Sequence, residues 1–359
     1  FDDFLQKLHV NYVDTINDDK LVDVAITAIL KELDPHSKYY SNLNYRDKVG
    51  SMSGTFTGIG IEYGMQNDSV YVTQIIPGGP AEKAGIMAGD RIISIQNENV
   101  TNGKYNNADI MNLIRGPRNT KVNLTIFRYG HTLPFTIERD IVPDRSIKMA
   151  YMINDSIGYI ALHIFNKTTR QEIDSTITSF NKRGMKSLIL DLQSNGGGYV
   201  ESALGTADEF LKKEQLVYYS VGNDQTRNYY YAVGQGQFQN GRLVVLINQA
   251  TASASEILTG SLQDWDRAVI VGRRSFGKGL MQRPVMLFDG SVVELTGARY
   301  YTPSGRLLQK PYKNIDYFGE VQNRFKTGEM NNPKYIPVTE SQKRKTLVYK
   351  RTVYGGGGI

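Results

Sequence analysis

The sequence predicts a multidomain α/β protein, and three observations support this fold class. Residues 1–45 contain apolar side chains at helical spacing, and residues 46–140 contain short alternating strands between glycine and proline turns. In residues 141–359 strands alternate with helices. A chain of 359 residues with 40% hydrophobic content is long enough for two or three domains with buried cores. The three segments are therefore the predicted domains.

Composition excludes several classes of site. The chain has no cysteine, which excludes disulfides, thiolate metal sites and a cysteine nucleophile. It has neither a His-x-x-x-His pair nor carboxylates clustered at ligand spacing, so no metal and no other cofactor is expected. The net charge of +6 comes from dispersed lysine and arginine, so no nucleic-acid partner is expected. No apolar run reaches the roughly 18 residues of a membrane span. The first residue is Phe1, so a signal peptide or membrane anchor could precede it.

The amino-terminal region carries one strong helical pattern. Apolar side chains recur at spacings of three and four from Val22 to Leu33, Asp18 or Asp19 can cap the helix, and Asp34-Pro35 ends it. Such a segment could pair with a second copy of the chain, so a homo-oligomer is one expected partner.

The central region is predicted to be β-rich, with strands near 69–73, 91–95 and 122–126. The stretch Gly58-Ile59-Gly60-Ile61 precedes them. Glycines there would free backbone N–H groups to receive a terminal carboxylate, and the next strand could add a peptide at its edge. A hairpin turn is the alternative interpretation of Gly-x-Gly alone.

The stretch around which the rest of the chain is organised lies in the last domain. An apolar strand, Leu243 to Ile247, is followed by a turn of small residues and then by helical periodicity from Glu256. A tight strand-turn-helix of this kind bends sharply and exposes a hydroxyl group. A second apolar strand, Ala268–Val271, leads into Gly277-Lys278-Gly279.

A serine nucleophile needs a base, and the sequence offers two kinds. The four histidines lie far from the turn in sequence, although a triad assembled in space stays open; they are His9, His36, His131 and His163. Lys278 is the other candidate, because burial disfavours its charged form and a neutral lysine can accept the serine proton.

These residues resemble the carboxyl-terminal processing, or tail-specific, proteases, which are serine peptidases with a Ser-Lys dyad and an inserted PDZ domain. The matching stretches are Thr251–Ile257, Gln263-Asp264, Arg267-Ala268 and Phe276–Gly279 with Gln282. The resemblance implies Ser253 as nucleophile and Lys278, 25 residues later, as base. It also implies that Gln282 orients Lys278 and that Glu256 supports the site.

The same resemblance assigns further residues. The strand Leu188–Leu192 and the loop Gln193–Gly198 match a family motif in which the N–H groups of Gly197 and Ala254 form the oxyanion hole, with Asp191 in a supporting position. The chain departs from that motif at Gln193 and Gly196, where the family often has arginine and proline. A phosphate loop is the alternative, but no Gly-Lys-Ser/Thr follows.

For the central region the resemblance implies a PDZ domain at residues 46–140. Its peptide-binding residues would be Gly58, Ile59, Gly60 and Ile61, and Arg115 would couple peptide binding to the active site. Residues 1–45 would be an amino-terminal helical region. Residues 141–359 would be a peptidase domain of the ClpP/crotonase-like α/β type, truncated at its carboxyl end.

The predicted function is a serine endopeptidase that recognises protein or peptide substrates by their free C-termini and cleaves them through an acyl-enzyme. The family also implies a periplasmic or cell-envelope location. Two alternatives remain. Ser275-Phe276-Gly277-Lys278 with Lys326-Thr327-Gly328 resembles penicillin-binding enzymes, although glycine disfavours the helix that chemistry needs. The other is an inactive homologue that acts as a PDZ adaptor.

Overall fold

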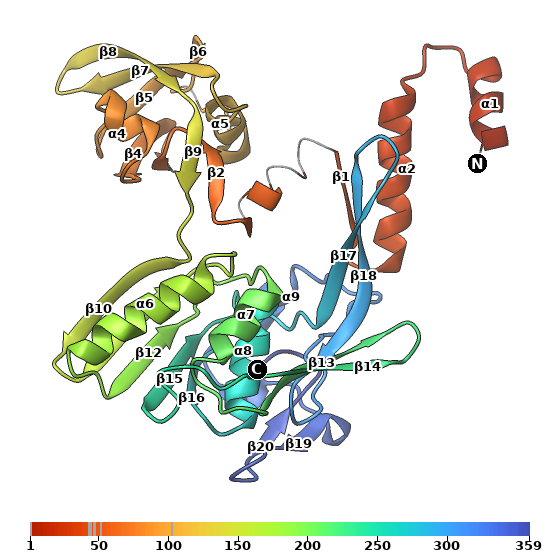
Figure 1. Cartoon of the computed structure of the whole chain (residues 1–359). Coiled ribbons are helices and arrows are strands. Elements are labelled where there is room, and N and C mark those ends of the chain that lie inside the picture. Colours follow the sequence, from red (N-terminus) through yellow and green to blue (C-terminus); the bar gives the residue numbers. More distant parts are fainter. Residues whose placement is uncertain (1, 42–44, 46–47, 51, 102) are drawn as a thin grey trace.

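The structure is a computed structural model that describes residues 2–41, 45, 48–50, 52–101 and 103–359. Figure 1 shows a β-rich central domain above a larger carboxy-terminal domain, with the amino-terminal helices at one side. The mixed α/β fold agrees with the predicted class. In the described part of the chain no helix is both long and apolar enough to cross a lipid bilayer.

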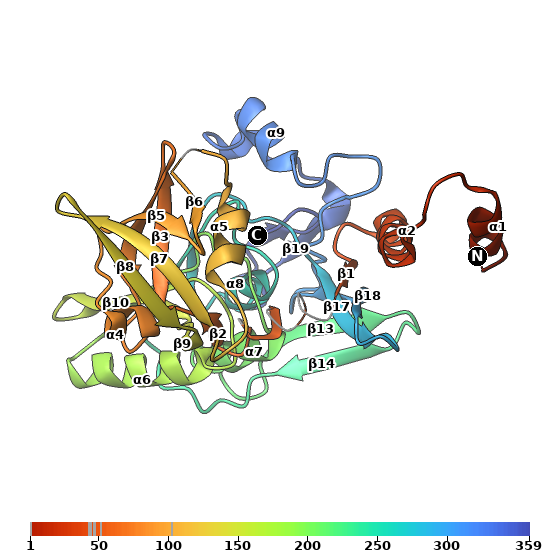
Figure 2. The same ribbon diagram turned by 90° about the horizontal axis from the view of Figure 1, so that it is seen from above.

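The amino-terminal region contains two helices and one strand: α1 (Asp2–Asn11), α2 (Asp18–Leu33) and β1 (Lys38–Tyr40). The predicted caps of α2 were Asp18 or Asp19, but the cap in the structure is Asn17. Its side chain accepts a hydrogen bond from the N–H of Lys20. The helix ends at Leu33, as the following Asp34-Pro35 predicted. α1 lies apart from the rest of the chain in both views, whereas α2 lies beside β1 (Figures 1 and 2). β1 pairs with a strand of the carboxy-terminal domain, so residues 1–45 are not helical throughout.

The central domain is a small β-structure with two helices. Its elements are β3 (Ile61–Gln66), β4 (Ser69–Ile75), α4 (Pro80–Ala84), β5 (Arg91–Ile95), β6 (Glu98–Asn99), α5 (Asn107–Ile114), β7 (Lys121–Arg128) and β8 (His131–Glu138). The sheet has the order β3-β4-β5-β7-β8, with β6 beside β5. Alternate side chains of β7, including Val122 and Ile126, are buried against α4 and α5, as a half-buried strand requires.

A two-stranded ribbon joins this domain to the next. It consists of β2 (Thr55–Gly58) and β9 (Asp140–Pro143), paired antiparallel. The predicted boundary between residues 140 and 141 therefore falls inside a strand. Figure 1 shows this ribbon between the two domains.

The carboxy-terminal domain contains two five-stranded sheets and a separate two-stranded sheet formed by β19 (Lys343–Lys345) and β20 (Thr352–Tyr354). The elements of its first sheet and the helices that cover it are β10 (Ile147–Asn154), β11 (Ile157–Leu162), α6 (Thr169–Lys182), β12 (Ser187–Asp191), α7 (Val200–Ala207), β15 (Arg242–Ile247), α8 (Ala254–Asp264) and β16 (Val269–Gly272). The second five-stranded sheet combines β1 with four strands of this domain, β13 (Leu216–Gly222), β14 (Arg227–Tyr231), β17 (Leu280–Met286) and β18 (Val292–Tyr301). The remaining elements are α9 (Glu320–Lys326), η1 (Pro333–Tyr335) and η2 (Glu340–Gln342).

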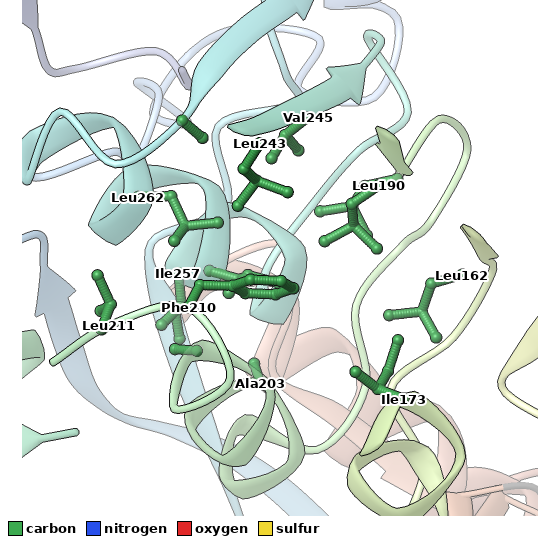
Figure 3. Close-up of a cluster of buried hydrophobic side chains, with 14 of the residues drawn as sticks. Leu162, Ile173, Leu190, Ala203, Phe210, Leu211, Leu243, Val245, Ile257 and Leu262 are labelled. Atoms are coloured by element: carbon green, nitrogen blue, oxygen red, sulfur yellow. The ribbon is translucent and has the colours of Figure 1, made fainter. Parts of the chain in front are cut away.

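The first sheet has the order β10-β11-β12-β15-β16, and all its strands except β10 run parallel. The side chains on one face of these strands are buried under α6, α7 and α8 (Figure 3). Phe210, Ile257 and Leu262 are among the fully buried members of this cluster. This burial holds α8 in place.

Parallel topology brings three loops to one edge of the sheet. The loops after β12, β15 and β16 all leave from the carboxyl ends of neighbouring strands. In α/β sheets that edge is the usual place for a binding or catalytic site. Here it receives the glycine loop Gln193–Gly198, the turn before Ser253 and the segment that carries Lys278.

Candidate active site

The turn after β15 holds Ser253 in a strained backbone conformation. Its φ of 59° and ψ of −120° lie outside the regions that non-glycine residues usually occupy. Ser253 is the residue directly before α8, whose helix starts at Ala254. The small side chains around it, Ala252 and Ala254, are buried and leave room for the sharp bend. The predicted strand-turn-helix is therefore present, and it presents a partly exposed serine.

Glu256 connects the two predicted catalytic residues. One carboxylate oxygen accepts the N–H of Ser253 at 2.9 Å and the N–H of Lys278 at 2.8 Å. The other accepts the N–H of Gly277 at 2.7 Å and the hydroxyl of Ser275 at 2.5 Å. The side chain is fully buried, which raises the pKa of Glu256, while the four donated hydrogen bonds act in the opposite direction. A single carboxylate thus sets the spacing between two segments that are 25 residues apart in sequence.

The backbone around Lys278 is held from the other side as well. The buried hydroxyl of Tyr300 donates to the carbonyl of Lys278 and also contacts the carbonyl of Ser253 at 3.2 Å. The side chain of Gln309 accepts the N–H of Gly279 at 2.8 Å. The motifs in the sequence did not assign a role to either Tyr300 or Gln309. Tyr300 lies within the stretch 298–306 that resembles the family, whereas no sequence signal marked Gln309.

The environment of the Lys278 side chain favours the neutral amine. Burial is the main cause that lowers the pKa of Lys278 to about 8, and the positive charges of Lys48 and Lys38 act in the same direction. Glu294 and Glu256 oppose the shift. Among the described residues, no hydrogen bond joins Lys278 Nζ to Ser253 Oγ.

The glycine loop packs directly on the nucleophile turn. The carbonyl of Asn195 accepts the N–H of Ala252 at 3.0 Å, and a Cβ added to Gly197 would lie 2.8 Å from Ser253 Cβ and 2.9 Å from the amide nitrogen of Ala254. Gly197 has a φ of +99°, so glycine is required for its backbone as well as for space. The predicted oxyanion donors Gly197 and Ala254 are therefore neighbours. The N–H of Gly197, however, donates to Asn195 Oδ1 at 2.9 Å.

The two departures from the family motif have clear locations. Gln193 is exposed, and its N–H donates to Asp191, which also accepts the hydroxyl of Tyr159 at 2.6 Å. Asp191 thus holds the start of the glycine loop. No atom lies within 4 Å of a Cβ added to Gly196, so packing does not require glycine at that position.

In the part of the chain that the structure describes, no hydrogen bond joins Gln282 to Lys278. Gln282 lies on β17, and its side-chain amide donates to Thr296 Oγ1 at 3.2 Å on the neighbouring strand β18.

The penicillin-binding interpretation fails on geometry. Ser275 and Lys278 lie in an irregular segment rather than one helical turn apart, and Gly277 has a φ of +87°.

None of the four histidines hydrogen-bonds to Ser253. His36 contacts the hydroxyl of Tyr317 at 2.8 Å. Burial lowers the pKa of His36 to about 4, and the charge of Lys278 contributes. The electrostatic proximity of His36 to Lys278 was not visible in the sequence. Across the residues that the structure describes, a hydrogen bond to Ser253 therefore distinguishes neither histidine nor Lys278 as the base, and the lysine base remains a prediction.

A groove in the central domain contains the predicted peptide-binding residues. A cavity of about 310 Å³ lies between β3 and α5 and is lined by Gly58, Ile59, Gly60, Ile61, Phe56, Glu62, Tyr63, Asn107, Met111, Ile114 and Arg115. Gly60 has a φ of +80°, and a Cβ there would lie 3.2 Å from Gly79 Cα. The guanidinium of Arg115 lies 5.6 Å from the ring centre of Phe56. The groove is thus a strand-and-helix cleft with Arg115 at its border.

No group of three or more His, Asp or Glu side chains within the described ranges could hold a metal ion. The absence of a cofactor remains a prediction.

Comparisons with known proteins agree with the architecture. The profile of peptidase family S41 matches residues 156–317, and that of the PDZ domain matches residues 71–128.

Three relatives extend the match to most of the chain. The carboxy-terminal-processing protease of Bartonella bacilliformis is 36% identical over 316 residues, which is 86% of this chain and 72% of that protein. The carboxy-terminal processing protease CtpA of Bacillus subtilis is 33% identical over 307 residues, 85% of this chain and 65% of that one. A probable CtpA-like serine protease of Staphylococcus epidermidis is matched over 61% of its length. The chain thus spans about two thirds of these relatives.

Solved structures show the same fold. The photosystem II D1 C-terminal processing protease has a TM-score of 0.51 and 30% identity, with 85% of this chain and 83% of that chain covered. A putative S41 protease from Bacteroides fragilis has a TM-score of 0.54 at 17% identity and covers 88% of this chain and 86% of its own. This chain belongs to the carboxy-terminal-processing protease family, the S41 serine peptidases with a PDZ domain.

Proposed function

We propose that this chain cleaves protein substrates by a Ser253–Lys278 acyl-enzyme mechanism. Ser253 Oγ attacks the carbonyl carbon of the scissile peptide bond, and its proton passes to the neutral amine of Lys278. The tetrahedral intermediate then breaks the C–N bond, and Lys278 returns the proton to the departing amine. Water attacks the ester in a second round, in which Lys278 again takes and returns a proton, so that the acid product and free Ser253 are formed.

The observation that carries this proposal is the shared carboxylate of Glu256. It accepts the backbone N–H groups of both Ser253 and Lys278, so the backbones of the two residues are held together by one side chain. Burial of Lys278 supports the proton transfer, because a pKa of about 8 leaves a useful fraction of neutral amine near neutral pH.

The oxyanion hole is proposed to use the N–H groups of Gly197 and Ala254. In the present arrangement the Gly197 N–H is bonded to Asn195 Oδ1 rather than free for a substrate. Together with the missing Ser253–Lys278 hydrogen bond, this supports a resting form. Rotation of the Gly197 peptide away from Asn195 would complete the site. Gln282 could then turn from Thr296 to orient Lys278.

Substrate selection is proposed to begin in the PDZ groove. Members of this domain class bind free C-termini by adding a peptide strand, and the cavity between β3 and α5 is lined by the residues predicted to receive it. Arg115 at the border of the groove is proposed to sense the bound peptide. The partner is therefore a protein or peptide with a free carboxyl end.

The test is cleavage of a loosely folded protein by the wild-type chain, Ser253→Ala and Lys278→Ala. We expect wild type to cleave and both variants to lose activity by at least about 10³-fold. Equal cleavage by all three would place the nucleophile elsewhere. If wild type is inactive but binds peptide C-termini, the alternative of a PDZ adaptor without peptidase activity is favoured.

Two further proposals concern the setting of the enzyme. A periplasmic or cell-envelope location follows from the family resemblance, and cell fractionation tests it.

A homo-oligomer is supported by exposed apolar side chains on α2, namely Val24, Ile29 and Leu33. Light scattering of the wild type and of a variant with Ile29→Lys would show whether α2 mediates it.

A further inference from the structure

The glycine-rich stretch near residue 359 is packed into the domain. In sequence, a run such as Gly355–Gly358 is typical of a flexible linker. Here the N–H of Gly356 donates to the carbonyl of Leu307 at 2.6 Å, and the N–H of Gly358 donates to that of Leu308 at 3.0 Å. Ile359 packs against the main hydrophobic core. Both views place this end of the chain beside α8 (Figures 1 and 2).

The segment Gly357–Ile359 contacts the segment that carries Lys278. The N–H of Ile359 donates to Ser275 Oγ at 2.7 Å, and its carbonyl accepts the N–H of Ser275 at 3.2 Å. The guanidinium of Arg274 donates to the carbonyl of Gly357 at 2.8 Å. These three bonds fix the backbone just before the lysine.

The contact between the two segments leaves no room for side chains. A Cβ on Gly358, whose φ is +102°, would lie 2.6 Å from the carbonyl oxygen of Ser275. A Cβ on Gly277 would lie 3.0 Å from the carbonyl carbon of Gly357. Backbone therefore packs on backbone, which explains why glycine occurs on both sides of this contact.

A chain of hydrogen bonds leads from this contact to the proposed nucleophile. Because Ser275 Oγ accepts the N–H of Ile359, its own proton is directed to Glu256 at 2.5 Å. The same carboxylate accepts the N–H groups of Ser253 and Lys278. The two residues in the middle of this series of hydrogen bonds, Ser275 and Glu256, are both fully buried.

We propose that Gly357–Ile359 is a positioning element of the active site, which acts through Ser275 on Glu256 and so fixes the relative placement of Ser253 and Lys278. The inference rests on the proposed Ser-Lys function. Gly357–Ile359 touches neither reacting atom, and neither does Ser275. Their effect is expected in the rate of acylation rather than in substrate affinity.

The experiment compares Gly358→Ala with Gly356→Ala. Both glycines have positive φ and lie in the same run, but a Cβ on Gly356 would meet the side-chain amide of Gln342 instead of Ser275. The readouts are the rate at which a fluorophosphonate probe labels Ser253, its pH dependence, and kcat and KM for a loosely folded protein. Each is measured at a temperature at which circular dichroism shows every variant folded.

We expect Gly358→Ala to lower labelling and kcat by about 10- to 100-fold with KM unchanged, because small displacements of catalytic groups are costly. Gly356→Ala should stay within about twofold of wild type in labelling, since it leaves the contact with Ser275 intact. Ser275→Ala provides a second route, because it removes the hydroxyl without adding strain; it should lower labelling in the same direction.

Three results would overturn the inference. Equal losses in Gly358→Ala and Gly356→Ala would indicate a general effect on stability. Wild-type labelling in folded Gly358→Ala, or in Ser275→Ala should Gly358→Ala not fold, would show that the contact does not matter. If the probe does not label Ser253 in the wild type, the proposed function fails and the inference falls with it, whereas labelled wild type with unaffected variants refutes the inference alone.

Discussion

The two halves of the active site differ in how firmly they are held. The backbone of Lys278 is bonded at its N–H to Glu256 and at its carbonyl to Tyr300, and Gly279 is bonded to Gln309. In the glycine loop the carbonyl of Gly197 accepts the N–H of Phe165 at 2.9 Å, whereas the N–H of Gly197 donates to the side chain of Asn195. The backbones of Ser253 and Lys278 are thus the fixed half of the proposed site, whereas the N–H of Gly197, which must leave Asn195 to bind an oxyanion, belongs to the adjustable half.

The largest effect is expected from Glu256→Gln, which weakens the hydrogen bonds that hold the backbones of Ser253 and Lys278. An amide offers one acceptor oxygen, so either the pair Ser253 and Lys278 or the pair Ser275 and Gly277 loses its partner. We expect kcat to fall by about 100-fold and the free energy of unfolding by about 2 kcal/mol or more. Kinetics and thermal denaturation measure the two effects.

Glu209→Gln is the matched control. Glu209 is a buried glutamate of the same domain, and its side chain accepts the N–H of Gln237 at 3.0 Å. We expect it to affect stability but to leave kcat near wild type. An equal loss of kcat in both variants would mean that Glu256 acts through general stability and not through the site.

The pH profile tests the base within the fixed half. Because the pKa of Lys278 is lowered to about 8, the reactive neutral form increases as pH rises and levels off above pH 8. Acylation should therefore rise about 50-fold between pH 6 and pH 8. Stopped-flow labelling of Ser253 measures this, with circular dichroism as the control for folding. A midpoint near 6.5 would instead indicate a histidine base.

Tyr300→Phe removes the hydroxyl that links the two catalytic segments. It leaves the buried carbonyl of Lys278 without this partner, so we expect a loss of stability of about 1–3 kcal/mol and a roughly tenfold loss of kcat. Tyr218→Phe is the control, since Tyr218 is buried in the same sheet with its ring stacked on Tyr230. A Tyr300→Phe enzyme with wild-type kcat would show that Glu256 alone is sufficient.

The smallest effect is expected from Arg115→Ala, which tests how the PDZ groove reaches the adjustable half. Loss of the cation at the groove should reduce kcat/KM for substrates with a free C-terminus by about threefold to tenfold, since Arg115 is only half-buried and a charge that solvent screens contributes modestly. Arg118→Ala is the control, because Arg118 pairs with Asp140 and does not line the groove. Unchanged turnover in Arg115→Ala would remove Arg115 from the pathway.

Local sequence patterns determined most of the elements. The strand Arg91–Ile95 was predicted with its observed bounds, and the helices near Leu33 and after Ser253 were predicted within a few residues. These segments succeed because hydrophobic period and turn residues are local properties of the chain. The family of the chain could also be predicted, because the 25-residue spacing between Ser253 and Lys278 is a property of the sequence alone.

The tertiary structure decided which partners these residues have. Nothing local in the sequence pairs Ser275 with Ile359, Gly279 with Gln309, or β1 with β18, because each contact joins segments far apart in the chain. It also redirected the amide of Gly197 to Asn195 and placed Gln282 on Thr296. The sequence by itself determined which groups the site contains, since these are set by residue type and spacing. Their hydrogen-bond partners were decided by the packing of the sheets, which brings distant backbone atoms within bonding distance.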